Sequence, residues 1–165
     1  MKFTGKEYYE AGLERIRQAR VLHATGQDYA LAMYAAGLAV ECLLRAFRWD
    51  KDKSFEGRHD LIDLLKASAL LNLHEEQLRD RGIAIEEIER IGLELGIAMN
   101  EVVLLWHNNL RFASEACLRA FLKRLGRIQG LKGNVNVLKQ NSMDLLQAAQ
   151  TVVDRGVVLW TLKKK

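Results

Sequence analysis

The feature that most constrains this chain is a run of small and apolar residues between Tyr29 and Phe47. At helical spacing one side of this run carries mostly alanine and another side carries larger apolar groups, so a helix here is apolar almost all round. Such a helix belongs inside a fold. Its small side chains let neighbouring helices approach to about 8–10 Å between axes. The sequence therefore predicts a central helix with the others packed around it.

Glu41 is the one acidic residue in this run, and a buried carboxylate must be paired or change its protonation state. Arg45 stands one helical turn further on, at the spacing of an intrahelical pair. We therefore predict a buried Glu41–Arg45 ion pair. The alternative is a structural pair on a partly solvated flank of the helix.

The length of 165 residues predicts a single domain over 1–165, large enough to bury a core without disulfides or metals. The absence of proline favours helices joined by short connections over a sandwich or a barrel. The predicted fold class is all-α, an up-and-down helical bundle of four to five long helices plus a short one. The periodicity predicts helices over 5–25, 29–47, from Arg58 or His59 to about Asn72, over 84–109, after Ser114 to Leu125, and over 134–162.

Composition also bounds the location of the protein. Cys42 and Cys117 lie inside apolar helical patterns, so we predict two buried thiols rather than a disulfide. The N-terminus lacks the apolar segment of a signal peptide, and we expect no apolar run that approaches the ~18 residues of a membrane span. A cytoplasmic protein with no membrane partner is expected. The net charge of +4 is weak support for nucleic-acid binding, because three positive charges are in 163–165.

Four motifs occur in a recognisable order. They are Gly26-Gln-Asp-Tyr-Ala30, Ala35-Ala-Gly-Leu-Ala-Val-Glu-Cys-Leu-Leu-Arg45, Arg58-His-Asp-Leu-Ile-Asp-Leu-Leu65 and Leu104-Leu-Trp-His-Asn-Asn-Leu-Arg-Phe112. In this order the chain resembles the HEPN family. The resemblance implies an up-and-down helical bundle that usually forms a homodimer, sometimes beside a nucleotidyltransferase partner. Many members of this family are metal-independent ribonucleases.

The ribonuclease members carry an arginine, four to six further residues, and a histidine near the fourth long helix. Metal-free cleavage uses the RNA 2′-hydroxyl as nucleophile, so a histidine serves as acid or base and an arginine stabilises the phosphorane. Upstream of His107, positions 101–103 are Glu, Val and Val, so the arginine is missing there. Arg17 and His23 match the spacing, but a six-residue step leaves their side chains about 120° apart on a helix. His23 also continues an apolar stripe, so we interpret this match as coincidence.

A tentative ligand-binding site remains. His107 and Arg111 are four residues apart and would share a helix face, and Arg58 and His59 could join them in a small basic cleft. The alternative is that Arg111 braces the end of the fourth helix and His107 forms a local hydrogen bond.

Other chemistry has less support. The one Glu-x-x-His match ends at His59 and contains a glycine, which places it in a loop. The histidines and cysteines are scattered along the sequence. We therefore predict no metal, no cofactor and no catalytic residue. A basic strip with interleaved phenylalanines could bind phosphates but matches an ordinary surface helix better, and nothing suggests a reader of DNA sequence. The strip comprises Arg111, Arg119, Lys123, Arg124, Arg127 and Lys132.

These observations favour a catalytically silent, dimeric helical bundle that binds a partner protein, a nucleotide or RNA. The alternative is an endoribonuclease toxin of a HEPN/nucleotidyltransferase pair, with His107, Arg111 and His59 in the reaction. A third hypothesis is a structural subunit that completes a larger complex.

Overall fold

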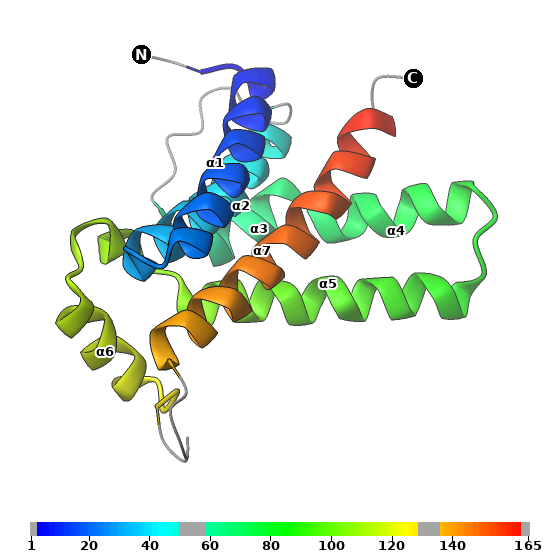
Figure 1. Cartoon of the computed structure of the whole chain (residues 1–165). Coiled ribbons are helices and arrows are strands. Elements are labelled where there is room, and N and C mark those ends of the chain that lie inside the picture. The colour runs from blue at the N-terminus through cyan, green and yellow to red at the C-terminus, as the bar shows by residue number, and fades with distance from the viewer. Residues whose placement is uncertain (1–2, 50–58, 129–135, 163–165) are drawn as a thin grey trace.

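The computed structural model describes residues 3–49, 59–128 and 136–162, and all regular structure in these ranges is helical (Figure 1). The all-α bundle predicted from the sequence is therefore confirmed. Its elements are α1 (Gly5–Thr25), α2 (Tyr29–Trp49), α3 (Leu61–Ser68), α4 (Leu70–Asp80), α5 (Ile85–Leu105), the 3₁₀ helix η1 (Asn108–Phe112), α6 (Glu115–Arg124) and α7 (Val137–Leu162).

The first two helices form an antiparallel hairpin (Figure 1). Thr4 and Glu7 form a capping box at the start of α1, and Gly26 ends that helix with a φ of 68°, which glycine adopts without strain. The Asp28 carboxylate then accepts the Leu31 N–H at 2.8 Å and caps α2.

Helix α2 is the centre of the fold, as predicted. It packs against α1, α7, α3 and η1, and Ala36 and Ala39 are fully buried. Neighbours approach closely where side chains are small: a Cβ on Gly12 of α1 would lie 3.1 Å from the Ala39 carbonyl oxygen. A Cβ on Gly156 of α7 would overlap the side chain of Leu43. The small residues therefore set the distances between the three helices.

The sequence analysis predicted no apolar run of membrane-spanning length, and this prediction is wrong for α2. Helix α2 is long and apolar enough to cross a membrane by length and composition, with a mean hydropathy of 1.5. However, 72% of the window that meets this criterion is buried inside the fold. Its apolar surface is therefore covered by the neighbouring helices.

Two predicted helices differ from the structure. The third is interrupted at Ala69, whose φ is 52°, and is followed by α4. At this break the Ser68 hydroxyl donates to the Leu65 carbonyl and accepts the Leu70 N–H. These side-chain hydrogen bonds compete with the backbone hydrogen bonds of a continuous helix. The long helix predicted to reach residue 109 ends at Leu105 instead. The polar 73–82 segment lies mostly in α4.

The apolar end of the last helix closes the bundle. The Trp160 ring stacks on Tyr9 with centroids 4.9 Å apart and meets Phe47 edge-on at 5.6 Å. The C-terminal part of α7 is thereby fixed against both α1 and α2.

The burial of Ala36 leads to a stability prediction. Ala36→Leu adds three carbon atoms where α2 has no free space, so we expect overpacking to lower the free energy of unfolding by about 1–3 kcal/mol. Urea unfolding would measure the change. Ala24→Leu, at an exposed position of α1, is the matched control and should change stability by less than about 0.5 kcal/mol. Equal stability of Ala36→Leu and the wild type would contradict the packing described for α2.

Candidate functional site

A buried carboxylate lies at the base of the candidate site. Glu41 of α2 is only 2% exposed, and Arg45 Nε donates to its Oε1 at 2.8 Å. His59 Nδ1 lies 2.9 Å from each Glu41 oxygen. The pair expected from the four-residue spacing is thus present in its buried form, and it has a third member that the spacing did not indicate. The two partners offset the desolvation of the carboxylate.

The contact with Glu41 fixes the protonation pattern of the His59 ring. A carboxylate oxygen only accepts hydrogen bonds, so Nδ1 carries a proton and donates it. The side chain of His59 is 49% exposed, and its Nε2 has no hydrogen-bond partner within the described residues. Asp60 fixes the backbone beside it, because its carboxylate accepts the N–H groups of Ile62 and Asp63 at 2.9 and 3.0 Å and caps α3.

The opposite wall comes from the segment that follows α5. Trp106 lies in a notch at Gly37 of α2, where any Cβ would overlap the indole ring, and its Nε1 donates to the Tyr34 carbonyl at 3.1 Å. His107 is extended and caps η1, accepting the Asn109 N–H on Nδ1 at 3.1 Å. The neutral His107 ring therefore carries its proton on Nε2, the reverse of His59.

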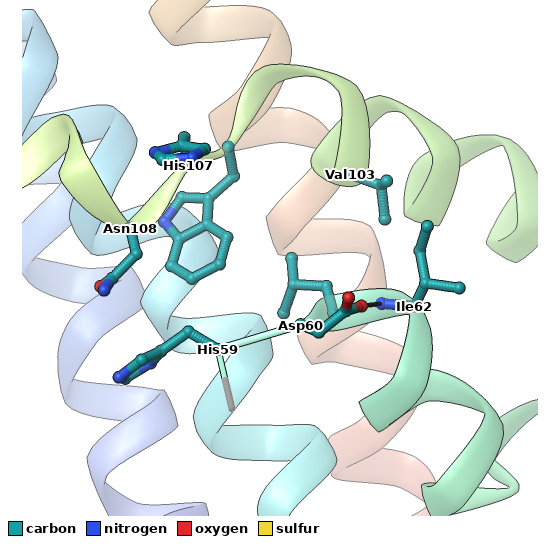
Figure 2. Close-up of a pocket in the computed structure, with 8 residues that line it drawn as sticks. His59, Asp60, Ile62, Val103, His107 and Asn108 are labelled. Carbon is teal, nitrogen blue, oxygen red and sulfur yellow. Dashed lines mark hydrogen bonds between the residues drawn. The ribbon is translucent and has the colours of Figure 1, made fainter. Parts of the chain in front are cut away.

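These two walls enclose an open cleft of about 410 Å³. Figure 2 shows His59, Asp60 and Ile62 on one side of it and Val103, His107 and Asn108 on the other. Leu61 and Trp106 complete its lining. We call this space the histidine cleft. It combines apolar walls with a few polar groups, which is the usual composition of a small-molecule site.

The structure brings together two of the four predicted ligand-binding residues. His59 and His107 line the same cleft, and Arg58 lies outside the described residues. Arg111 does not line the cleft but stacks on the neighbouring ring of Phe112, 4.6 Å from its centroid. The prediction that His107 and Arg111 share a helix face is wrong. The chain forms a 3₁₀ helix there, with three residues per turn, so a four-residue step rotates by about 120°.

The second arginine–histidine match does not form a site within this protomer. His23 is buried and its Nδ1 lies 3.0 Å from the Ser142 hydroxyl, and burial lowers its pKa. Arg17 is exposed on α1, where its Nε donates to the Leu13 carbonyl at 3.4 Å. The two side chains therefore lie in different environments, as the helical spacing predicted.

The predicted basic strip is divided by the fold. Arg127 is held by Asn141 at 3.1 Å, by Asp144 at 3.1 Å and by a close ion pair with Glu101, so it links α5 to α7. Arg119 and Lys123 remain exposed on α6, as an ordinary surface helix would have them. Lys132 lies outside the described residues.

The prediction for the cysteines is half correct. Cys42 is buried, and burial together with the neighbouring Glu41 raises the pKa of its thiol to about 11. Cys117 is exposed on α6, which contradicts the prediction of two buried thiols. The helix buries Leu118 and Leu122 instead and turns Cys117 to the surface. Among the described residues, no group of three metal-ligating side chains comes together.

Sequence reasoning missed much of the cleft wall. It did not single out Trp106, Asp60, Asn108 or Gly37 as parts of a site. One signal could have revealed the contact: Gly37 is the single glycine in a helix otherwise built on alanine, which is typical of a position where a bulky group approaches the backbone. Nothing in the sequence indicates that this group is Trp106, 69 positions away, because the contact is tertiary.

The structure is thus that of an all-helical domain with a buried Glu–Arg–His cluster beside a cleft. The HEPN domain model matches residues 6–95, more than half of the chain, and the chain belongs to the HEPN family. At family level this is a helical module associated with nucleotides or RNA. Comparison with curated proteins and with solved structures found no match. The matched residues include Glu41, Arg45 and His59, whereas His107 lies beyond them.

The fit of Trp106 against Gly37 gives a prediction for the cleft wall. Gly37→Ala places a methyl group inside the space of the indole ring, so we expect a loss of about 3 kcal/mol in unfolding free energy and a shifted tryptophan emission spectrum. Gly96→Ala is the matched control, since a Cβ there meets nothing within 4 Å and should stabilise α5 by about 0.5–1 kcal/mol. Unchanged stability and emission in Gly37→Ala would refute the described contact.

Proposed function

We propose that this HEPN domain is a binding module that holds a nucleobase, free or in an RNA strand, in the histidine cleft without cleaving the strand. The observation that carries the proposal is that two histidines line facing walls of one cleft and carry their protons on different ring nitrogens. When both rings are neutral, His59 offers an acceptor at Nε2 and His107 a donor at Nε2. A nucleobase edge carries both donors and acceptors.

The rest of the lining supports a base more than a phosphate. Leu61, Val103 and Trp106 supply apolar walls for the faces of a planar ring. The carboxylate of Asp60 favours a hydrogen-bond donor such as an exocyclic amine and disfavours a phosphate. The buried Oδ1 atom of Asn108 has no hydrogen-bond partner in the described structure, and an amine of a bound base could provide one.

The charge of the cleft supports binding without cleavage. Cleavage of RNA without a metal requires a cation that stabilises the phosphorane. Among the described residues, those that line the histidine cleft include no lysine or arginine, and Arg111 is stacked on Phe112 instead. The sequence positions 101–103 likewise hold no arginine.

Binding to the cleft can be tested directly. We expect the wild-type protein to bind AMP in isothermal titration calorimetry and a labelled single-stranded oligoribonucleotide in fluorescence anisotropy. His59→Ala and His107→Ala should each weaken both interactions about tenfold, the loss expected for one hydrogen bond in a binding site. Arg17→Ala, an exposed change on α1, should bind as the wild type does.

The same samples test for cleavage. After incubation in EDTA, we expect the labelled RNA to remain intact by gel electrophoresis. Failure of both ligands to bind, or equal binding by His59→Ala and the wild type, would refute the proposed site.

A second candidate function has one observation in its favour. Glu41 holds Nδ1 of His59 and leaves Nε2 open to solvent, the arrangement that a histidine needs to act as a general base. His107 could then protonate the leaving oxygen. RNA cleavage in EDTA that disappears in both histidine variants would establish this endoribonuclease function and contradict catalytic silence.

We also infer that the domain forms a homodimer through the outer face of α5. Leu93 and Ile97 are 67% and 60% exposed there, and Leu104 continues the same face. Two of the neighbouring acidic residues are paired, because Arg90 pairs with Glu87 at 2.6 Å and closely with Glu94, and Arg155 of α7 lies 3.6 Å from Glu94. An uncharged apolar stripe can meet its own copy around a twofold axis without repulsion.

A charge on this stripe should prevent the pairing. We expect the wild type to elute as a dimer in size-exclusion chromatography with light scattering and Ile97→Glu to elute as a monomer, since two buried carboxylates would face each other. Val21→Glu, at a comparably exposed position of α1, should remain dimeric. A monomeric wild type would refute the dimer, and stoichiometric binding of another protein at this face would assign it to a heterocomplex.

A further inference from the structure

A second groove lies on the other side of His107. It has a volume of about 510 Å³ and is lined by residues of η1, α6 and the segments next to them. We call it the aromatic groove. Its lining consists of His107, Asn109, Leu110, Phe112, Ala113, Cys117, Phe121 and Arg124. His107 belongs to both this groove and the histidine cleft, so the two spaces adjoin at one side chain.

The aromatic groove exposes a ring that the fold does not use. Phe112 is 75% exposed, the highest value among the exposed large hydrophobic residues described. The Arg111 guanidinium lies 4.6 Å from its ring centroid, and Arg124 lines the same groove. Within the described residues, neither arginine forms an ion pair with an acidic residue. The groove therefore combines an exposed aromatic ring with the positive charge of Arg124 on its wall, and the positive charge of Arg111 lies beside it on the Phe112 ring.

This combination distinguishes between possible occupants. An apolar segment of a partner protein would use Phe112 and Phe121 but would gain nothing from the two guanidinium groups. A single-stranded nucleic acid uses both features, because its bases stack on aromatic rings and its phosphates attract arginine. Arginine planes and aromatic rings are also the surfaces on which unpaired RNA bases stack. The charge of the groove thus favours a nucleotide occupant.

We propose that the aromatic groove is a second nucleobase subsite, so that the ligand is a single-stranded RNA segment of at least two nucleotides that spans His107. One base occupies the histidine cleft, and its neighbour stacks on Phe112. The connecting phosphate then passes His107, with Arg124 and Arg111 on the groove side. This inference rests on the proposed function, because it takes the histidine cleft to be the first subsite.

Ligand length gives the first test. We expect the dinucleotide ApA to bind the 165-residue protein at least tenfold more tightly than AMP in isothermal titration calorimetry, as expected for one additional stacked base. Phe112→Ala should reduce the affinity for ApA to that for AMP and leave the affinity for AMP unchanged. Phe112→Trp should retain the preference for ApA, because the larger ring preserves the stacking surface. Phe3→Ala, at another exposed aromatic residue, is the matched control and should retain it too.

The two cysteines provide a second readout. Cys117 lines the aromatic groove and is exposed, whereas Cys42 is buried in α2. Saturating ApA should slow the alkylation of Cys117 by iodoacetamide several-fold, measured by mass spectrometry, while saturating AMP should not. Cys42 should stay unmodified in all samples and so confirm that the fold is intact.

The outcomes separate this inference from the proposed function. If AMP binds through His59 but ApA binds no more tightly and does not protect Cys117, the second subsite is refuted and the first stands. If neither ligand binds, both proposals are refuted. If Phe112→Ala changes the oligomeric mass in light scattering and leaves ApA affinity intact, the groove is a protein contact and the second subsite is again refuted.

Discussion

The close packing of α2 against its neighbours is the constraint on which this structure depends. Gly12 and Gly156 let α1 and α7 approach α2 at distances that larger side chains would prevent. Gly37 admits the Trp106 ring in the same way. Burial on this scale excludes water from α2, so its one carboxylate, Glu41, requires internal partners. Core packing and the polar cluster are therefore consequences of the same helix.

The polar cluster connects this core to the proposed binding surface. Glu41 is held in α2 by packing, Arg45 neutralises it within the helix, and His59 reaches it from the segment before α3. The His59 side chain is half-exposed, and its two 2.9 Å contacts with the buried Glu41 carboxylate hold the ring at Nδ1. A histidine fixed at Nδ1 can present Nε2 to a ligand in a constant orientation.

His107 is positioned by a different mechanism. Helix α5 ends where Trp106 turns back into the notch at Gly37, and the extended residue that follows caps η1. One side chain thereby separates two spaces, an apolar cleft with hydrogen-bonding groups and a groove with an exposed aromatic ring and one arginine in its wall. The proposed two-base ligand follows from this shared wall. The outer face of α5 remains available for a second copy of the chain.

The sequence by itself determined the helical class, the central helix, the caps at Gly26, Asp28 and Ser114, and the Glu41–Arg45 spacing. These features depend on residues within a few positions of each other, where helical periodicity and capping chemistry decide. Only the tertiary structure decided the break at Ala69, the end of α5 at Leu105, and the meeting of His59 with Glu41 and of Trp106 with Gly37. It also separated Arg111 from the cleft and exposed Cys117. Such outcomes depend on which distant surfaces pack together, and local spacing carries no information about that choice.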